Sequence, residues 1–241
     1  MKTKSLLIAC LLIPALMFAA KKLEAFTPYT IGADKTGTAL MLKFEKGNQH
    51  NHPLFAVWLA DMNGTFIETL YVSESIGKGV FPRVDRKKGA WMAGAIQRPA
   101  ALPYWAHQRN IQNEFGTYNP SQTHPEVDGN TGATPSASFI LHLKTTNVLE
   151  GNYQVFVELN QSWDWNEFWY NDRFPGDKEY MTSSQPALVY SVKFDTRQKM
   201  SYPLKPVGHS SYNGSDGNLN PDLKTLTTAL QIARSITLEV R

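Results

Sequence analysis

The residues best placed to do chemistry form the heptapeptide Asp-Gly-Asn-Thr-Gly-Ala-Thr, which ends at Thr134. Gly132 and Ala133 are small, so a bulky group could approach the hydroxyl of Thr134. The carboxylate of Asp128 can hold the segment by accepting amide N–H groups, and Ser136 can hydrogen-bond a phosphate. A free threonine is a poor nucleophile, so a reaction here needs an external base or metal. A structural turn is the alternative, because Asp-Gly and Thr-Gly are turn-forming pairs.

An aromatic run, Trp-Asp-Trp-Asn-Glu-Phe-Trp-Tyr, is the second candidate site. Rings mixed with amide and carboxylate groups are typical of a sugar-binding surface or a partner-docking loop. The rings of this possible ligand surface are Trp163, Trp165, Trp169 and Tyr170. The same rings could instead close the end of the fold or pack a long insertion. A catalytic pair drawn from Asp164, Glu167 and Asp172 is less specific, because acids in such loops are usually solvated or cap turns.

Metal ligation is not predicted. His50 and His52 form an H-x-H pair at strand spacing, and further loop histidines could converge on it, but the spacing matches no established zinc pattern. Residues 213–222 are rich in oxygen atoms but do not follow the register of a calcium loop. No catalytic triad, phosphate loop or dinucleotide fingerprint occurs. The sequence therefore favours an attachment point or a binding surface over an enzyme with its own substrate.

The N-terminus predicts export. A short basic segment precedes an apolar run at residues 5–20, which is typical of a secretory signal peptide within residues 1–25, cleaved between 19 and 25. The run is too short for a comfortable membrane span. A lipoprotein signal is the alternative, because residues 7–10 resemble a lipobox ending at Cys10. The apolar stretch before Cys10 is shorter than such signals usually have.

Composition bounds the partners and the fold. Cys10 is the single cysteine of the 241 residues, so the exported chain has no disulfide and relies on its core. Cleavage after Ala20 would remove two lysines and lower the net charge from +3 to +1. A nearly neutral surface argues against nucleic acid or an anionic membrane as the main partner. A periplasmic or otherwise extracytoplasmic protein is expected, and its oligomeric state is not predicted.

Alternation of apolar and polar residues predicts an all-β fold. Seven strands are expected, at residues 38–44, 55–59, 66–72, 138–143, 153–159, 187–194 and 236–240. The Asn63-Gly64 pair predicts a hairpin between the second and third of them. Seven short strands imply an antiparallel β-sandwich, here a single domain over residues 26–241.

Three insertions interrupt the strands, at residues 73–127, 160–186 and 195–222. A short helix is expected near residues 100–110 of the first, and another within 223–234, before the last strand. Long excursions from a β-scaffold commonly carry function.

The heptapeptide resembles the D-x-x-[ST]-G-A-T sequence of proteins to which a periplasmic flavin transferase attaches FMN. The bond in those proteins is a phosphodiester to the last threonine, and they include flavin-bearing subunits of sodium-pumping NADH:quinone oxidoreductases. The resemblance implies covalent FMN on Thr134. It places the cofactor contacts at Asp128, Thr131, Gly132, Ala133, Thr134 and Ser136. The flavin ring also needs a stacking surface, for which the candidates are Trp105, Trp163, Trp165, Trp169 and Tyr170.

A second resemblance covers nearly all of the chain after the signal. Four segments, in this order, are similar to a family of predicted periplasmic proteins of unknown function: residues 52–72, 127–134, 151–160 and 222–229. Members of that family resemble immunoglobulin-like sandwiches, and their genes often lie beside those for the flavin transferase and PepSY-type membrane flavoproteins. Their V-W-x-x-D-x-x-G-x-F-x-x-T-L pattern occupies residues 57–70. The chain lacks any other recognisable part of the FMN-binding domain of the usual carriers.

Two functions follow as expectations. In the first, FMN on Thr134 takes electrons from a membrane flavoprotein or another redox partner, after a flavin transferase has attached it. In the second, the protein carries no cofactor and binds a sugar or a protein through the loop from Trp163 to Tyr170.

Overall fold

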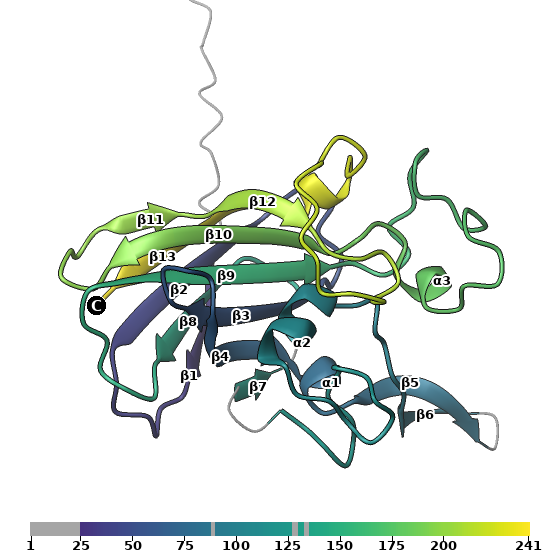
Figure 1. Cartoon of the computed structure of the whole chain (residues 1–241), viewed down its shortest axis with the longest axis horizontal. Coiled ribbons are helices and arrows are strands. Elements are labelled where there is room, and N and C mark those ends of the chain that lie inside the picture. The colour runs from purple at the N-terminus through teal and green to yellow at the C-terminus, as the bar shows by residue number, and fades with distance from the viewer. Residues whose placement is uncertain (1–24, 88–89, 127–129, 133–134) are drawn as a thin grey trace, which may run out of the picture.

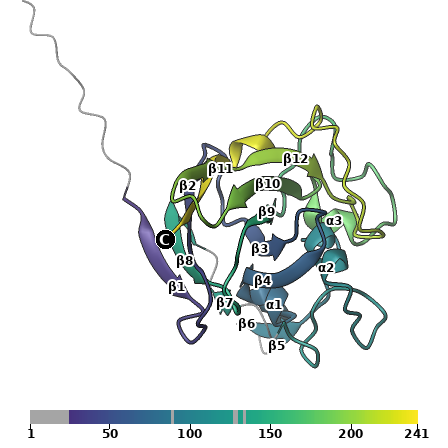
Figure 2. The ribbon, with the colours of Figure 1, turned by 60° about the vertical axis from the view of Figure 1, so that its left-hand side comes forward.

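The computed structural model describes residues 25–87, 90–126, 130–132 and 135–241, which form a two-sheet β-sandwich (Figures 1 and 2). In sheet A the strand order is β1 (Thr27–Ile31), β8 (Phe139–Lys144), β2 (Ala39–Lys46), β13 (Ala233–Val240) and β11 (Ser201–Pro203). In sheet B the order is β12 (Lys205–His209), β10 (Leu188–Asp195), β9 (Asn152–Asn160), β3 (Leu54–Ala60), β4 (Phe66–Ser73) and β7 (Asn130–Gly132). The expected all-β sandwich is confirmed.

The remaining elements lie beside the sheets. Strands β5 (Val80–Lys87) and β6 (Ala90–Ala95) form a separate two-stranded hairpin. The helices are short: α1 (Glu74–Gly77), α2 (Pro103–Arg109), α3 (Tyr180–Ser183) and the 3-10 turn η1 (Ala229–Gln231). Within the described residues, no helix is long and apolar enough to cross a membrane.

The seven expected strands correspond to β2, β3, β4, β8, β9, β10 and β13. Most neighbouring strands pair antiparallel, but the pairs β1·β8 and β4·β7 at the sheet edges are parallel. The expected helix in the first insertion is α2, and the one before the last strand is the single turn η1. The insertion at residues 195–222, in which the sequence predicts no strand, contains the two edge strands β11 and β12.

The main core lies between the two sheets. Stacked phenylalanine rings form its centre, with Phe139 placed 4.8 Å from Phe44 and 5.2 Å from Phe55 between ring centroids. All three side chains are buried. Burial of a phenylalanine or leucine side chain stabilises a fold by roughly 1.5–3 kcal/mol, so this aromatic stack contributes strongly to sandwich stability.

The outer face of sheet B is covered as well. Trp58 and Phe156 stack on that face with ring centroids 5.2 Å apart, and Tyr104 of α2 packs against Trp58 at 5.9 Å. Trp105 of α2 is fully buried beside them. Strand β3 is therefore buried on both faces, which explains why its sequence is apolar throughout instead of alternating.

The β3–β4 hairpin turns at Asn63-Gly64, as predicted. Oδ1 of Asp61 accepts the backbone N–H groups of Asn63 at 2.8 Å and Thr65 at 2.9 Å. Gly64 has a φ of +88°, a left-handed conformation that favours glycine. The other patterned residues of 57–70 are structural too: Val57 and Leu70 lie in the core between the sheets, and Trp58 and Phe66 pack on the outer face.

Sheet A joins the two ends of the described chain. Strand β13 pairs with β2 in a register that sets Leu40 opposite Val240. Strand β8 then separates β2 from β1.

Candidate functional site

The described part of the heptapeptide forms the last strand of sheet B. Its residues Asn130–Gly132 form β7, which pairs with β4 so that Tyr71 faces Asn130 and Ser73 faces Gly132. Asp128, Ala133 and Thr134 lie outside the described residues, as do the side chains of residues 130–132. Ser136, the expected phosphate contact, is exposed.

The chain is fixed on both sides of this segment. Upstream, the side chains of Glu126 and Arg109 form a buried ion pair, and the backbone N–H of Glu126 donates to the carbonyl of Gly77 at 2.7 Å. Downstream, Ser138 is buried, and its Oγ accepts the backbone N–H of Lys46 at 2.9 Å. The heptapeptide therefore runs between two anchors in the folded scaffold.

The direction of β7 shows at which end of sheet B the chain leaves this strand. Because β7 is parallel to β4, the chain leaves Gly132 at the end of sheet B where β4 finishes at Ser73. The backbone N–H of Phe55 donates to Ser73 Oγ at 3.0 Å, and the neighbouring Leu54 pairs with Asn160. The insertion at residues 160–186 starts from the same end of sheet B as the heptapeptide.

The aromatic run does not form one exposed surface. Trp169 is buried in the main core, and its Nε1 donates to Thr225 Oγ1 at 3.0 Å. Trp165 is half-buried and packs edge-on against Tyr180 with a centroid distance of 5.8 Å. The exposed large rings of this run are Trp163, Phe168 and Tyr170. Trp169 is thus ruled out as a surface ligand contact because it packs the insertion onto the sandwich.

Trp105 is not accessible to a flavin ring. Its side chain is fully buried between α2 and sheet B, and its indole Nε1 donates to Thr69 Oγ1 at 3.1 Å. This bond gives Thr69, the threonine of the 57–70 pattern, a structural role.

The acids of the aromatic run do not form a catalytic pair. Oδ1 of Asp164 accepts the hydroxyl of Thr228 at 2.6 Å, and burial raises the pKa of this carboxyl. Glu167 and Asp172 are exposed. Asp164 therefore ties the insertion to the segment before β13.

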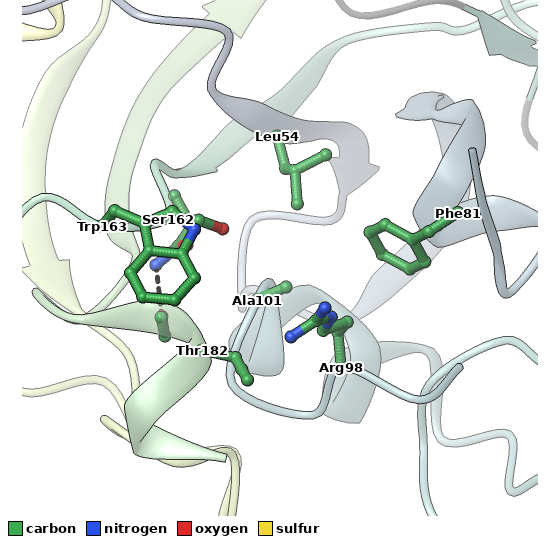
Figure 3. Close-up of a pocket in the computed structure, with 9 residues that line it drawn as sticks. Leu54, Phe81, Arg98, Ala101, Ser162, Trp163 and Thr182 are labelled. Carbon is green, nitrogen blue, oxygen red and sulfur yellow. Dashed lines mark hydrogen bonds between the residues drawn. The ribbon is translucent and has the colours of Figure 1, made fainter. Parts of the chain in front are cut away.

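A small pocket lies where the first two insertions meet on the outer side of sheet B (Figure 3). Its volume is about 100 Å³. Trp163 lies on one side of it, Phe81 and Arg98 lie on the other, and Leu54 and Ala101 lie between them. Its polar lining is completed by Asn160, Ser162, Thr182 and Ser183.

Two polar groups of this pocket have spare hydrogen-bonding capacity. Asn160 is buried, and its Nδ2 donates to Ser183 Oγ at 2.8 Å and to the carbonyl of Gln185 at 3.1 Å. Its Oδ1 accepts no hydrogen bond from the described residues. The half-buried guanidinium of Arg98 forms no hydrogen bond or close ion pair within the described chain and lies over the Phe81 ring at 5.5 Å.

The positive charge of Arg98 in the pocket has a carboxylate, Glu179, nearby. Burial lowers the pKa of Arg98, and the nearby Glu179 carboxylate opposes that change. Burial likewise raises the pKa of Glu179, and Arg98 opposes it. Glu179 does not line the pocket, but its carboxylate partly offsets the charge of Arg98, so a neutral polar ligand suits the pocket better than a carboxylate.

Trp163 combines exposure with an unfavourable backbone conformation. Its side chain is 71% exposed, and its φ of 67° lies in the left-handed region. That region costs a residue other than glycine on the order of 1–2 kcal/mol. Because strained residues cluster at functional sites, Trp163 is a better candidate ligand contact than its buried neighbours.

Sequence reasoning missed two titratable clusters. Glu158 on β9 is completely buried beneath α2, where its carboxylate accepts the backbone N–H groups of Tyr104 at 3.1 Å and Trp105 at 2.7 Å. Burial raises the pKa of Glu158 to about 7, although these hydrogen bonds oppose the change. The only sequence signal for this site was the single acid, Glu158, in the otherwise apolar stretch of β9 from Val155 to Leu159.

The second cluster brings together a serine, a histidine and a glutamate. Ser121 Oγ donates to Glu114 Oε2 at 2.6 Å, and His124 Nδ1 lies 2.9 Å from the same oxygen. The Ser121 hydroxyl therefore donates to the acid and not to the imidazole, which is the wrong order for activating a nucleophile. Hydrogen bonds from Ser121 and Thr123 lower the pKa of Glu114 to about 2 and brace the loop.

Metal ligands are not gathered anywhere in the described residues, where no group of three or more histidine, cysteine or acidic side chains could hold an ion. His50 and His52 belong to no such group.

Comparisons of the sequence and the structure with known proteins find no matching family model, no matching curated protein and no matching solved structure.

Proposed function

We propose that this protein is an exported carrier that holds FMN covalently on Thr134 and transfers electrons outside the cytoplasm, either alone or as an accessory subunit. The observation that carries the proposal is the heptapeptide ending at Thr134, which resembles the acceptor sequence of periplasmic flavin transferases. When bound, FMN supplies the redox chemistry that ordinary side chains lack. The electron donor is proposed to be a membrane flavoprotein.

The setting of the heptapeptide supports this role. Strand β7 is at the edge of sheet B, where another protein can approach the backbone without displacing a neighbouring strand. The Arg109–Glu126 ion pair on one side and the buried Ser138 on the other hold the chain that flanks the heptapeptide. Fixed flanks leave fewer backbone residues to be ordered when the transferase engages the acceptor.

The attachment reaction assigns a limited role to the chain. The Oγ of Thr134 forms a bond to the FMN phosphorus of FAD, the pyrophosphate bond breaks, and AMP leaves. The hydroxyl proton passes to a base of the transferase, because a threonine without a neighbouring base is a poor nucleophile. Thr134 therefore supplies the attachment atom, and the transferase supplies the catalysis.

The deciding experiment is the intact mass of the exported protein after co-expression with a periplasmic flavin transferase. We expect an FMN-sized addition that persists after denaturation, gives a yellow protein, and disappears in a Thr134→Val variant. Thr30→Val, the same change at an exposed threonine of β1 outside the heptapeptide, should retain the addition. No addition, under conditions that modify a known acceptor protein, would reject the proposal and leave the heptapeptide as a structural turn.

A binding module without a cofactor is the second candidate. The specific observation in its favour is the exposure of Trp163, Phe168 and Tyr170 on one insertion. In this role, the rings would bind a sugar or a protein partner. A saturable change in tryptophan fluorescence on titration with neutral oligosaccharides, lost in Tyr170→Ala, would support the sugar form of this candidate. A flat titration would argue against it.

A further inference from the structure

We infer that the pocket between Trp163 and Arg98 binds the edge of a planar heteroaromatic ring, namely the pyrimidine edge of the flavin isoalloxazine. This inference rests on the proposed function for the identity of the ring. It goes further by assigning a ring-binding site to described residues that belong to neither the heptapeptide nor its anchors.

The unused hydrogen-bonding groups define the ligand edge. Asn160 Oδ1 is a buried acceptor without a partner among the described residues, so it can accept a hydrogen bond from a ligand. Arg98 offers donors and therefore requires an acceptor. A flavin presents this combination on adjacent atoms, because its N3–H lies between two carbonyl groups. The offsetting charges of Arg98 and Glu179 suit this neutral edge better than a carboxylate.

The apolar lining defines the shape of the ligand. The exposed Trp163 ring offers a flat face for stacking, and Phe81 and Leu54 complete the wall. A volume of about 100 Å³ is smaller than the roughly 150 Å³ cavity that holds a benzene molecule. Only the edge of a three-ring system can therefore enter, and the rest of the ring would remain outside, against Trp163.

Strand β7 places Gly132, the last described residue before Thr134, at the same end of sheet B as the pocket residues Leu54 and Asn160. Leu54 lies on β3, which is separated from β7 only by β4, so the two strands are about 10 Å apart. The chain leaves Gly132 toward the same end of sheet B. Two residues then lead to Thr134 and extend the reach by at most about 7 Å. The phosphodiester and the ribityl chain of FMN span a comparable distance.

The test uses riboflavin, because it carries the ring but has no phosphate and cannot be attached to Thr134. The full exported chain, made without a flavin transferase, is titrated while flavin fluorescence is followed. We expect saturable quenching by the Trp163 indole. Trp163→Ala should weaken binding at least about tenfold, as expected for loss of an aromatic anchor. Trp91→Ala, which removes another exposed indole, on the β5–β6 hairpin, should leave binding unchanged.

The polar contacts are tested by one change in the protein and one change in the ligand. Arg98→Gln should weaken riboflavin binding by roughly 10-fold or more, because a charge-assisted hydrogen bond is lost. Methylation of riboflavin at N3 removes the donor for Asn160, so 3-methylriboflavin should bind worse to the unaltered protein. This ligand change leaves the buried Asn160 and its bonds to Ser183 and Gln185 in place. In the flavinylated protein, Arg98→Gln should lower the midpoint potential, because a positive charge near the ring stabilises its reduced anionic form.

The outcomes separate this inference from the proposed function. Failure of riboflavin to bind, equal binding by wild type and Trp163→Ala, or binding of a hexose in its place would overturn the inference. Covalent FMN on Thr134 could still be present in each of these cases, and the intact mass would reveal it. Conversely, riboflavin binding without any mass addition would support the pocket and reject the covalent carrier. Thermal unfolding of each variant confirms that it is folded.

Discussion

The backbone N–H of Trp105 donates a 2.7 Å hydrogen bond to the buried carboxylate of Glu158, which links helix α2 to the outer face of sheet B. The carboxylate is removed from water, and its remaining oxygen accepts the N–H of Tyr104. The attachment of α2 to the sandwich is consequently sensitive to the protonation of one residue.

Stability should fall as the pH rises from about 4.5 to about 7. Burial raises the pKa of Glu158 from 4.5 to about 7 in the folded chain, so the folded state retains a proton that the unfolded state loses in this interval. This difference corresponds to about 3 kcal/mol, and the effect levels off above pH 7. Urea unfolding midpoints measured across this interval should show the fall. Glu158→Gln should remove it, whereas Glu150→Gln, at an exposed turn, should not. An unchanged slope in Glu158→Gln would contradict the assignment.

The bond between Trp105 and Thr69 should be measurable as a coupling. Trp105→Phe and Thr69→Val each remove one partner of the 3.1 Å hydrogen bond and should cost about 1–3 kcal/mol, because the other partner stays buried. The double variant should cost less than the sum of the two single variants. Chemical denaturation of the four proteins gives the coupling energy, and strict additivity would show that the bond contributes nothing.

The buried Arg109–Glu126 pair should be far more costly to break than a surface pair. Glu126→Ala leaves a buried guanidinium and should destabilise the fold by about 3–5 kcal/mol. Glu45→Ala removes the partner of Arg234 at an exposed site and should cost about 1 kcal/mol or less. Glu126 lies two residues before the heptapeptide, so the proposed flavinylation of Thr134 should also slow in Glu126→Ala. Similar unfolding midpoints for these two variants would count against the anchor.

Substitutions of Gly64 should show how much the β3–β4 hairpin depends on a left-handed residue at this turn. The φ of +88° at Gly64 is unfavourable for alanine, but an added Cβ would meet no atom within 4 Å. Gly64→Ala should therefore cost about 1 kcal/mol through backbone strain alone, and Gly64→Asn should cost less, because asparagine tolerates the left-handed region better. Thermal unfolding distinguishes the two variants. If both were neutral, the hairpin would tolerate a different turn.

The sequence predicted the central strands because their inward-facing residues alternate, as Leu40, Leu42 and Phe44 do along β2. It missed short edge strands such as β11 and β12, in which Pro203 and Pro206 interrupt the pattern. Residues 195–222 therefore resembled a loop. The covered outer face of sheet B was also unpredictable, because the long apolar strand β3 does not reveal which distant segment packs on it.

The two candidate sites also differ in how far the sequence could predict them. The heptapeptide is continuous in sequence and could be identified there, but its anchor Arg109 comes from a helix that the chain order does not connect to it. The ring-binding pocket is assembled from Leu54, Arg98, Asn160 and Trp163, which are distant in sequence. The aromatic run indicated Trp163, but only burial separates it from Trp169.

The pairing of Leu40 with Val240 has a consequence for the time course of folding. Strand β2 cannot obtain its partner on the β13 side until nearly the whole chain is available. Contacts between residues so far apart in sequence slow folding, because a long loop must close before they form. Sheet A should consequently be completed late, and β2 should lack its partner on this side until residues 233–240 have been synthesised.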